Sequence, residues 1–172
     1  MYLNIFRRFN NFFKYYKISF SIPKKIDLIF LDNNYSNISL KDLKFVYYKI
    51  EDKLQINIFI LFLSFLNIFQ IRNKNFTDIY FCKFIELHDP KIAIGHEFEA
   101  HIYRFKKFFP NRISIMYQTA DYNNFYEKTA PKLISQNGKY NLKSDYLLCK
   151  NSFADKFLNF IDSKKIIVGS VR

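Results

Sequence analysis

From residue 91 onward, short apolar runs of strand length alternate with longer segments whose apolar residues repeat at helical spacing. The expected order is strand 91–96, helix 98–109, strand 112–117, a long loop, strand 144–149, helix 151–161 and strand 164–169. Strands that alternate with crossover helices pair in parallel, so this order predicts an α/β domain with a Rossmann-like sheet. With the first third of the chain included, we expect a mostly parallel sheet of about six strands with helices on both faces.

The first third supplies the remaining expected elements. Residues 26–31 form a continuous apolar run, typical of a parallel strand covered on both faces, and 44–50 read as a second strand. Helices are expected at 56–69 and 76–87. The first of these has fewer than the roughly twenty apolar residues that a membrane span needs, so we expect a buried core helix.

We expect residues 1–22 to form a separate N-terminal segment and residues 23–172 to form a single α/β domain. In 1–20, apolar residues at helical spacing alternate with Arg7, Arg8, Lys14 and Lys17. Such a basic amphipathic helix either packs on the domain or lies on an anionic membrane surface.

The chain has 172 residues and a formal net charge of +12. A basic chain favours an anionic partner, such as nucleic acid, an anionic membrane or a phosphorylated sugar. The alternative is that lysine is simply the common surface residue of a compositionally biased chain. The sequence contains neither paired zinc ligands nor an aromatic RNA-binding motif, which disfavours nucleic acid. Cys82 and Cys149 read as buried apolar residues of a reducing, cytoplasmic compartment.

Polar residues directly follow several of the expected strands. They are Asp32, Asn33, His96, Glu97, Gln118 and Ser170. The carboxyl ends of parallel strands share one edge of a sheet, where ligands bind in α/β folds. We therefore expect His96 or Glu97 to act as a general base, and the other four to bind substrate. The alternative is that these strands simply end in polar residues.

Several familiar sites are excluded by spacing. His96 and His101 are five positions apart, whereas helical zinc ligands are four apart, so no metal site is expected. The three glycines form neither a dinucleotide-binding loop, a P-loop nor a nucleophile elbow, and no cofactor is expected. We expect His101 to face solvent and His88 to end a helix before Pro90.

Six short motifs follow one another in a characteristic order. They are DPKIAI at 89–94, FPN at 109–111, ISIMYQ at 113–118, SDY at 144–146, NSFAD at 151–155 and KIIVGS at 165–170. From about Pro23 on, this order resembles the amino-terminal half of bacterial surface-carbohydrate biosynthesis proteins with a two-domain GT-B glycosyltransferase fold. These are similar to the CDP-glycerol glycerophosphotransferase and polysialyltransferase group. The chain departs from the family pattern after Gln118, where Thr119 and Ala120 replace Asn-Gly, and at 96–98, where Asp-Asn-Asn is frequent.

The resemblance implies a transferase of sugar or sugar-phosphate units onto a surface glycan, at the inner face of the cell membrane. This chain would be the acceptor-side domain and would bind a glycan or lipid-linked glycan. The nucleotide-sugar donor would bind a second domain or chain, so a truncated or split product that is inactive alone is expected. The alternatives are a non-catalytic α/β binding module that pairs with another chain, and a basic nucleic-acid binder.

Overall fold

The computed structural model describes residues 15–32, 42–50, 53–68, 75–119, 135, 142–152 and 158–169. The chain falls into two compact units, residues 1–90 and 91–172. The larger sheet has six strands, β3-β2 from the first unit and β6-β7-β8-β9 from the second. Every strand pair of this sheet within either unit is parallel. The predicted α/β, Rossmann-like class is therefore confirmed, whereas the expected boundary at residue 22 stays a prediction.

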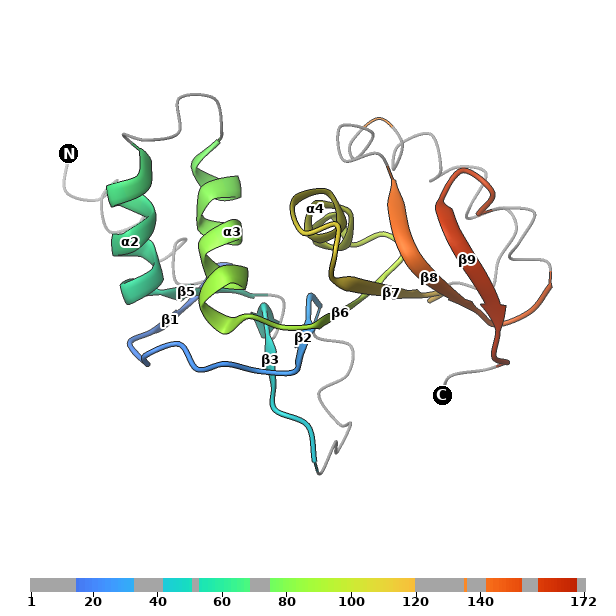
Figure 1. Ribbon diagram of the computed structural model, residues 1–172, viewed down its shortest axis with the longest axis horizontal. Coiled ribbons are helices and arrows are strands. Elements are labelled where there is room, and N and C mark those ends of the chain that lie inside the picture. The colour runs from blue at the N-terminus through green and yellow to red at the C-terminus, as the bar shows by residue number, and fades with distance from the viewer. Residues whose placement is uncertain are drawn as a thin grey trace, which may run out of the picture. The chain divides into compact units, whose positions relative to one another are not determined.

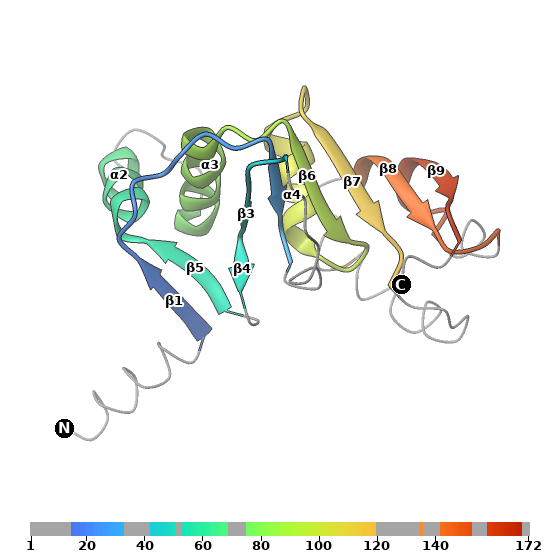
Figure 2. The same ribbon diagram turned by 90° about the horizontal axis from the view of Figure 1, so that it is seen from below.

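The second unit is a run of parallel strands with one described helix, and its four arrows point the same way in Figure 2. Its elements are β6 (Ile92–His96), α4 (Ala100–Phe108), β7 (Ile113–Tyr117), β8 (Lys143–Cys149) and β9 (Asp162–Ile167). Helix α4 contacts β6, β7 and β8, and its Ile102 and Phe105 are fully buried. It begins after Glu99, whose carboxylate accepts the His101 N–H at 3.2 Å, and it ends before Pro110.

The predicted elements of this unit are largely confirmed. The strands at 91–96, 112–117 and 144–149 and the helix at 98–109 all occur, and β9 begins two residues before the expected 164. Most of the helix expected at 151–161 lies outside the described residues, and the described ends of that range are turns and bends. Helices on both faces of the sheet therefore stay a prediction.

The first unit combines two strands of the larger sheet with a smaller sheet and two helices. Its elements are β1 (Tyr16–Ser19), β2 (Leu28–Phe30), β3 (Phe45–Tyr47), β4 (Lys49–Ile50), β5 (Lys53–Asn57), α2 (Ile58–Ile68) and α3 (Phe76–His88). The smaller sheet has the order β1-β5-β4. Strand β1 is parallel to β5, and β4 is antiparallel to it. Helices α2 and α3 lie side by side (Figures 1 and 2).

Tyr48 divides the stretch 44–50, which the sequence predicted as one strand, into β3 and β4. Its N–H donates to the carbonyl oxygen of Phe30 at 2.7 Å, and its own carbonyl accepts the N–H of Gln55 at 3.0 Å. Its buried ring packs edge-on against Phe81 and Phe84 of α3. The chain thus passes from the larger sheet to the smaller one at a single residue.

The helix predicted at 1–20 is wrong for its final residues, because 16–19 form β1, while 1–14 lie outside the described residues. Tyr16 and Ile18 pair with Leu54 and Ile56 of β5. Both segments alternate with a period of two, and pairing of the two strands outweighs the weak helical pattern.

Strand β5 delays the start of the helix expected at 56–69. Asn57 ends the strand and caps α2, because its Oδ1 accepts the N–H groups of Phe59 at 3.0 Å and Ile60 at 3.2 Å. An asparagine that accepts from the second and third helical residues is a preferred N-cap. The helix therefore begins at Ile58.

Helix α2 is not the buried core helix that the sequence predicted. Among its described side chains only Ile60 and Ser64 are buried, and a broad apolar face is exposed. No helix among the described residues is long and apolar enough to cross a membrane.

Two smaller predictions concern α3 and the cysteines. Helix α3 ends at His88, as expected, and the left-handed Asp89 (φ 52°) donates its N–H to Ile85 at 2.8 Å. Neither of the two cysteines forms a disulfide. Cys149 is buried as predicted, whereas Cys82 is partly exposed.

Candidate functional site at the carboxyl edge of β6, β7 and β8

The polar residues that follow three neighbouring strands lie along one edge of the second unit. Strands β6, β7 and β8 are parallel and paired in that order, so their carboxyl ends meet. His96 and Glu97 stand at the end of β6, Gln118 directly follows β7, and Lys150 follows β8. The sequence predicted from the strand order that His96, Glu97 and Gln118 share this edge, but it did not single out Lys150.

Glu97 is fully buried and joins the end of β6 to the end of β7. Its two carboxylate oxygens accept the Thr119 N–H at 2.9 and 3.0 Å, and the Thr119 hydroxyl at 3.1 and 3.2 Å. A buried carboxylate needs such donors to offset the loss of its hydration. Glu97, which the sequence predicted as a possible general base, is therefore held in position by hydrogen bonds from Thr119.

Gln118 makes the corresponding connection from β7 to β8. Its backbone N–H donates to the carbonyl of Leu148 at 2.9 Å, and its side-chain Oε1 accepts the N–H of Lys150 at 2.9 Å. The ammonium group of Lys150 donates to the carbonyl oxygen of Thr119 at 2.8 Å. The buried Gln118 side chain therefore holds Lys150, directly after β8, next to the end of β7.

His96 is partly exposed at the end of β6, beside the ring of Tyr117. Its Nδ1 accepts the backbone N–H of Phe98 at 3.1 Å. A neutral imidazole has one donor and one acceptor nitrogen, so this contact places the proton on Nε2. His96 in this tautomer is a hydrogen-bond donor at Nε2, which differs from the general base expected there.

Tyr103 of α4 holds the backbone at the same place. Its hydroxyl donates to the carbonyl oxygen of Glu97 at 2.6 Å. Burial raises the pKa of Tyr103, and the nearby charge of Glu97 raises it further. The phenol therefore stays protonated and keeps donating to this turn at any ordinary pH.

The remaining predicted site residues are Asp32, Asn33 and Ser170. Asp32 is buried after β2 in the first unit. Burial, and then the charge of Asp32, raise the pKa of Tyr47. Asn33 and Ser170 lie outside the described residues.

His101 does not face solvent, contrary to expectation. Its side chain is only 16% exposed, with Nε2 3.7 Å from Glu99 Oε1. Its Nδ1 lies 2.8 Å from Nη1 of Arg104, so the Arg104 guanidinium donates and the imidazole accepts. The three residues form one turn-spanning contact on α4. No cluster of metal-ligating side chains occurs in the described parts of the chain.

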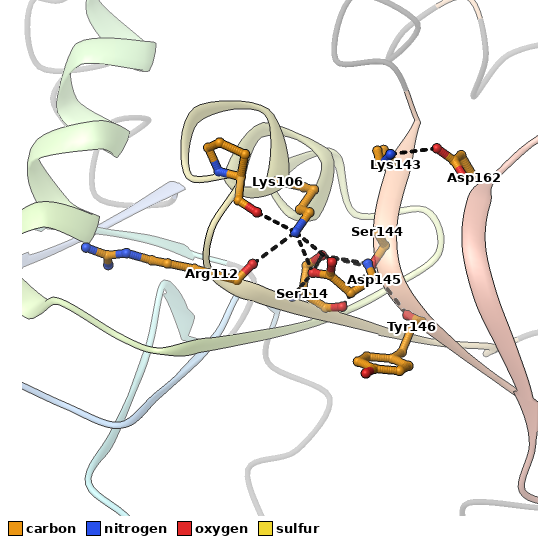
Figure 3. A network of polar contacts seen from close by, with 9 residues as sticks. Lys106, Arg112, Ser114, Lys143, Ser144, Asp145, Tyr146 and Asp162 are labelled. Carbon is orange, nitrogen blue, oxygen red and sulfur yellow. Dashed lines mark hydrogen bonds and ion pairs between the residues drawn. The ribbon is translucent and has the colours of Figure 1, made fainter.

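A second polar network, at the amino ends of β7 and β8, was not expected from the sequence (Figure 3). The ammonium of Lys106 lies 2.6 Å from Asp145 Oδ1 and also donates to the carbonyls of Pro110 at 2.7 Å and Arg112 at 3.1 Å. Oδ2 of Asp145 accepts the Ser114 N–H at 2.8 Å and hydroxyl at 3.0 Å. Because ligands of α/β folds bind at the carboxyl ends of strands, this network is structural.

Asp145 is ionised within that network. Partial burial alone would raise its pKa, but hydrogen bonds from Lys106 and Ser114 outweigh this and lower the pKa below the usual value of 3.8. Ser144 completes the network by donating to the Ser114 carbonyl at 3.0 Å.

Comparison of the chain with protein-family models, with curated proteins and with solved structures gives no match.

Proposed function

We propose that this chain is the acceptor-side domain of a glycosyltransferase-like protein of bacterial surface-polysaccharide biosynthesis, and that it binds an anionic glycan or lipid-linked glycan. The observation that carries the proposal is the polar edge at the ends of β6, β7 and β8, where the contacts of Glu97 with Thr119 and of Gln118 with Lys150 join neighbouring strand ends. The net charge of +12 favours a phosphorylated or acidic acceptor.

In this proposal His96 contacts the acceptor as a donor. Its Nδ1 is engaged by Phe98, so Nε2 carries the proton and suits a phosphate or hydroxyl oxygen. Glu97 and Gln118 are positioning residues whose contacts with Thr119 and Lys150 fix the edge. Asp32, Asn33 and Ser170 stay proposed substrate-binding residues.

The donor nucleotide sugar and the catalytic step belong, in the same proposal, to a second domain or chain. The two binding sites would face each other, as the carboxyl edges of α/β domains do in two-domain enzymes. This chain alone would bind acceptor without turning it over, at the cytoplasmic face of the membrane.

Calorimetry with the full chain tests this function. A short glycerol-phosphate oligomer should bind, and a neutral glucose oligomer of similar length should bind far more weakly. His96→Leu, which removes the donor, should weaken phosphate-oligomer binding by about tenfold, the loss of one hydrogen bond to a charged oxygen, while His101→Leu should not. Equal affinity for the two oligomers, or an unchanged affinity of the His96→Leu variant, would refute the proposal.

A second candidate function is a non-catalytic module that pairs with another chain, and β9 favours it. Strand β9 is last in the strand order, and Ile166, Ile167 and Val168 are 37%, 63% and 45% exposed. An apolar edge strand is a ready template for pairing. If this is the function, Ile167→Lys abolishes association with a separately purified partner domain, and neither oligomer binds.

A further inference from the structure

Helix α2 presents an apolar, uncharged face to solvent. None of its 11 residues is charged, and the exposed side chains are Ile58, Phe59, Phe62, Phe65 and Leu66, each 37–60% exposed. At about 3.6 residues per turn, these positions fall within roughly a third of the helix circumference. A helix that is apolar on all sides is ordinarily buried in a core or in a membrane. This face therefore requires something to cover it.

The loop after β1 passes the start of α2 (Figure 2). The side-chain amide of Asn57, the N-cap of α2, donates to the carbonyl of Ser21 at 2.6 Å. That contact holds Phe20 and Ile22, which are 80% and 75% exposed, beside the first turn of the helix. We call these two residues, together with the five exposed residues of α2, the α2 patch.

A basic groove adjoins the α2 patch and shares Ile22 with it. The groove has a volume of about 390 Å³, and three of its lining residues are Lys24, Lys25 and Lys44. Lys25 lies 3.2 Å from Asp89, but both side chains are at least half exposed, and such pairs are weak. The groove is therefore a cationic border to an apolar surface.

We propose that the α2 patch and this groove together form a docking surface for an anionic phospholipid bilayer. Phenylalanine and leucine side chains enter the boundary between headgroups and acyl chains, and the lysines contact headgroup phosphates. An 11-residue helix is about 16 Å long, so α2 lies on the membrane and does not cross it. The charge of +12 makes a second copy of the chain an unfavourable occupant of this face, because the two copies repel each other. The inference does not depend on the proposed transferase role.

Co-sedimentation of the full chain with vesicles tests the apolar part. Two compositions are needed: phosphatidylcholine alone, and equal parts of phosphatidylcholine and phosphatidylglycerol. Phe62→Gln combined with Leu66→Gln should lower binding to mixed vesicles by about tenfold or more, because two exposed apolar side chains lose their burial. Ile167→Gln, which removes an equally exposed apolar side chain from β9, is the matched control and should leave binding unchanged.

Lysine variants test the headgroup part. Lys24→Gln and Lys44→Gln should each lower binding to mixed vesicles by about fivefold, and leave binding to phosphatidylcholine vesicles unchanged. Lys164→Gln, a variant of an exposed lysine of β9, is the control. The effect of Lys24→Gln should shrink as potassium chloride screens the charges. Because these lysines are on the surface, their variants test the surface even if the helix variants fail to fold.

Three outcomes would overturn the inference. One is equal vesicle binding by the Phe62→Gln/Leu66→Gln variant and the unchanged chain. Another is a dimer of the unchanged chain that the same variant converts to a monomer in sedimentation equilibrium, because the face would then join two copies. The third is binding of inorganic phosphate at Lys24 and Lys44 without any binding to vesicles. The groove would then bind a free anion rather than a membrane.

Discussion

Lys106 near the end of α4 and Asp145 on β8 form an ion pair with an Nζ to Oδ1 distance of 2.6 Å, and Lys106 is only 10% exposed. Lys106→Met should lower the free energy of unfolding by about 2–4 kcal/mol, because it leaves a partly buried carboxylate without its cation. Urea denaturation measures the change. The exposed pair Lys143–Asp162, at 3.0 Å, offers the control. Lys143→Met should cost less than about 1 kcal/mol, and equal losses for both variants would contradict the assignment.

The pH dependence of stability should carry the signature of Asp145. Its pKa is lower in the folded chain than the usual 3.8. Its contribution is therefore complete above the unfolded value and is lost as the pH falls through the folded value. Urea midpoints below about pH 5 should decline more steeply for the unchanged chain than for Asp145→Asn. Parallel curves would show that the carboxylate titrates alike in both states.

His88 should weaken the fold in mildly acidic solution. Burial lowers its pKa from the usual 6.5, although the hydrogen bond between Nδ1 and the Lys24 carbonyl, at 2.9 Å, acts in the opposite direction. The folded chain thus prefers the neutral ring, and stability is lost as the pH falls below 6.5 through the folded value. A titration followed by NMR should give the lowered pKa of His88. His88→Phe keeps a ring against Phe84. In this variant, the midpoint of thermal unfolding should depend less on pH over this range.

The hydroxyl of Tyr80 should contribute to the junction of β5 and α2. It accepts the N–H of Asn57 at 2.8 Å and donates to the carbonyl of Gln55 at 3.0 Å. Tyr80→Phe leaves both groups without this partner and should cost about 1–3 kcal/mol in urea unfolding. Burial raises the pKa of Tyr80 to about 12, which an alkaline absorbance titration can detect. Tyr146→Phe, on a partly exposed residue, is the control and should change stability by less than about 0.5 kcal/mol.

Thr119 should matter to the carboxyl edge through its hydroxyl. That group donates to Glu97 Oε1 at 3.1 Å, and the carboxylate is fully buried. Thr119→Val keeps the side-chain shape but removes the donor, and should cost about 1–3 kcal/mol. Thr119→Ser should restore most of the loss. If the serine variant loses stability while the valine variant does not, packing of the side chain, rather than the hydrogen bond, is what holds this turn.

The sequence was sufficient for β6, α4, β7 and β8, because their signals are local. The apolar run of β6, the helical repeat of α4 and the stop at Pro110 each lie within a few residues. The gathering of His96 and Glu97 near Gln118 followed from parallel strand order alone. Their hydrogen-bond partners did not follow from it, because they depend on the conformations of the turns after each strand. Lys106 and Asp145 are 39 positions apart, and no local pattern joins them.

The first unit was harder to predict, because phenylalanine and isoleucine fill both strands and helices in this chain. Strand β1 has four residues and β5 has five, too few for a period of two to stand out. Their pairing becomes visible only when the two segments are aligned. The exposure of α2 was missed for a related reason. An apolar run predicts that something covers a helix, but it does not say whether the cover is the rest of the chain.

Tyr48 takes part in both sheets. Its N–H donates to the carbonyl oxygen of Phe30 in the larger sheet, and its carbonyl oxygen accepts the N–H of Gln55 in the smaller one. Neither sheet can shift its register without moving the other, so insertions or deletions near this residue would be felt in both at once. During evolution, this position can accept only changes that are compatible with both sheets. Insertions and deletions in this chain are therefore expected at other positions.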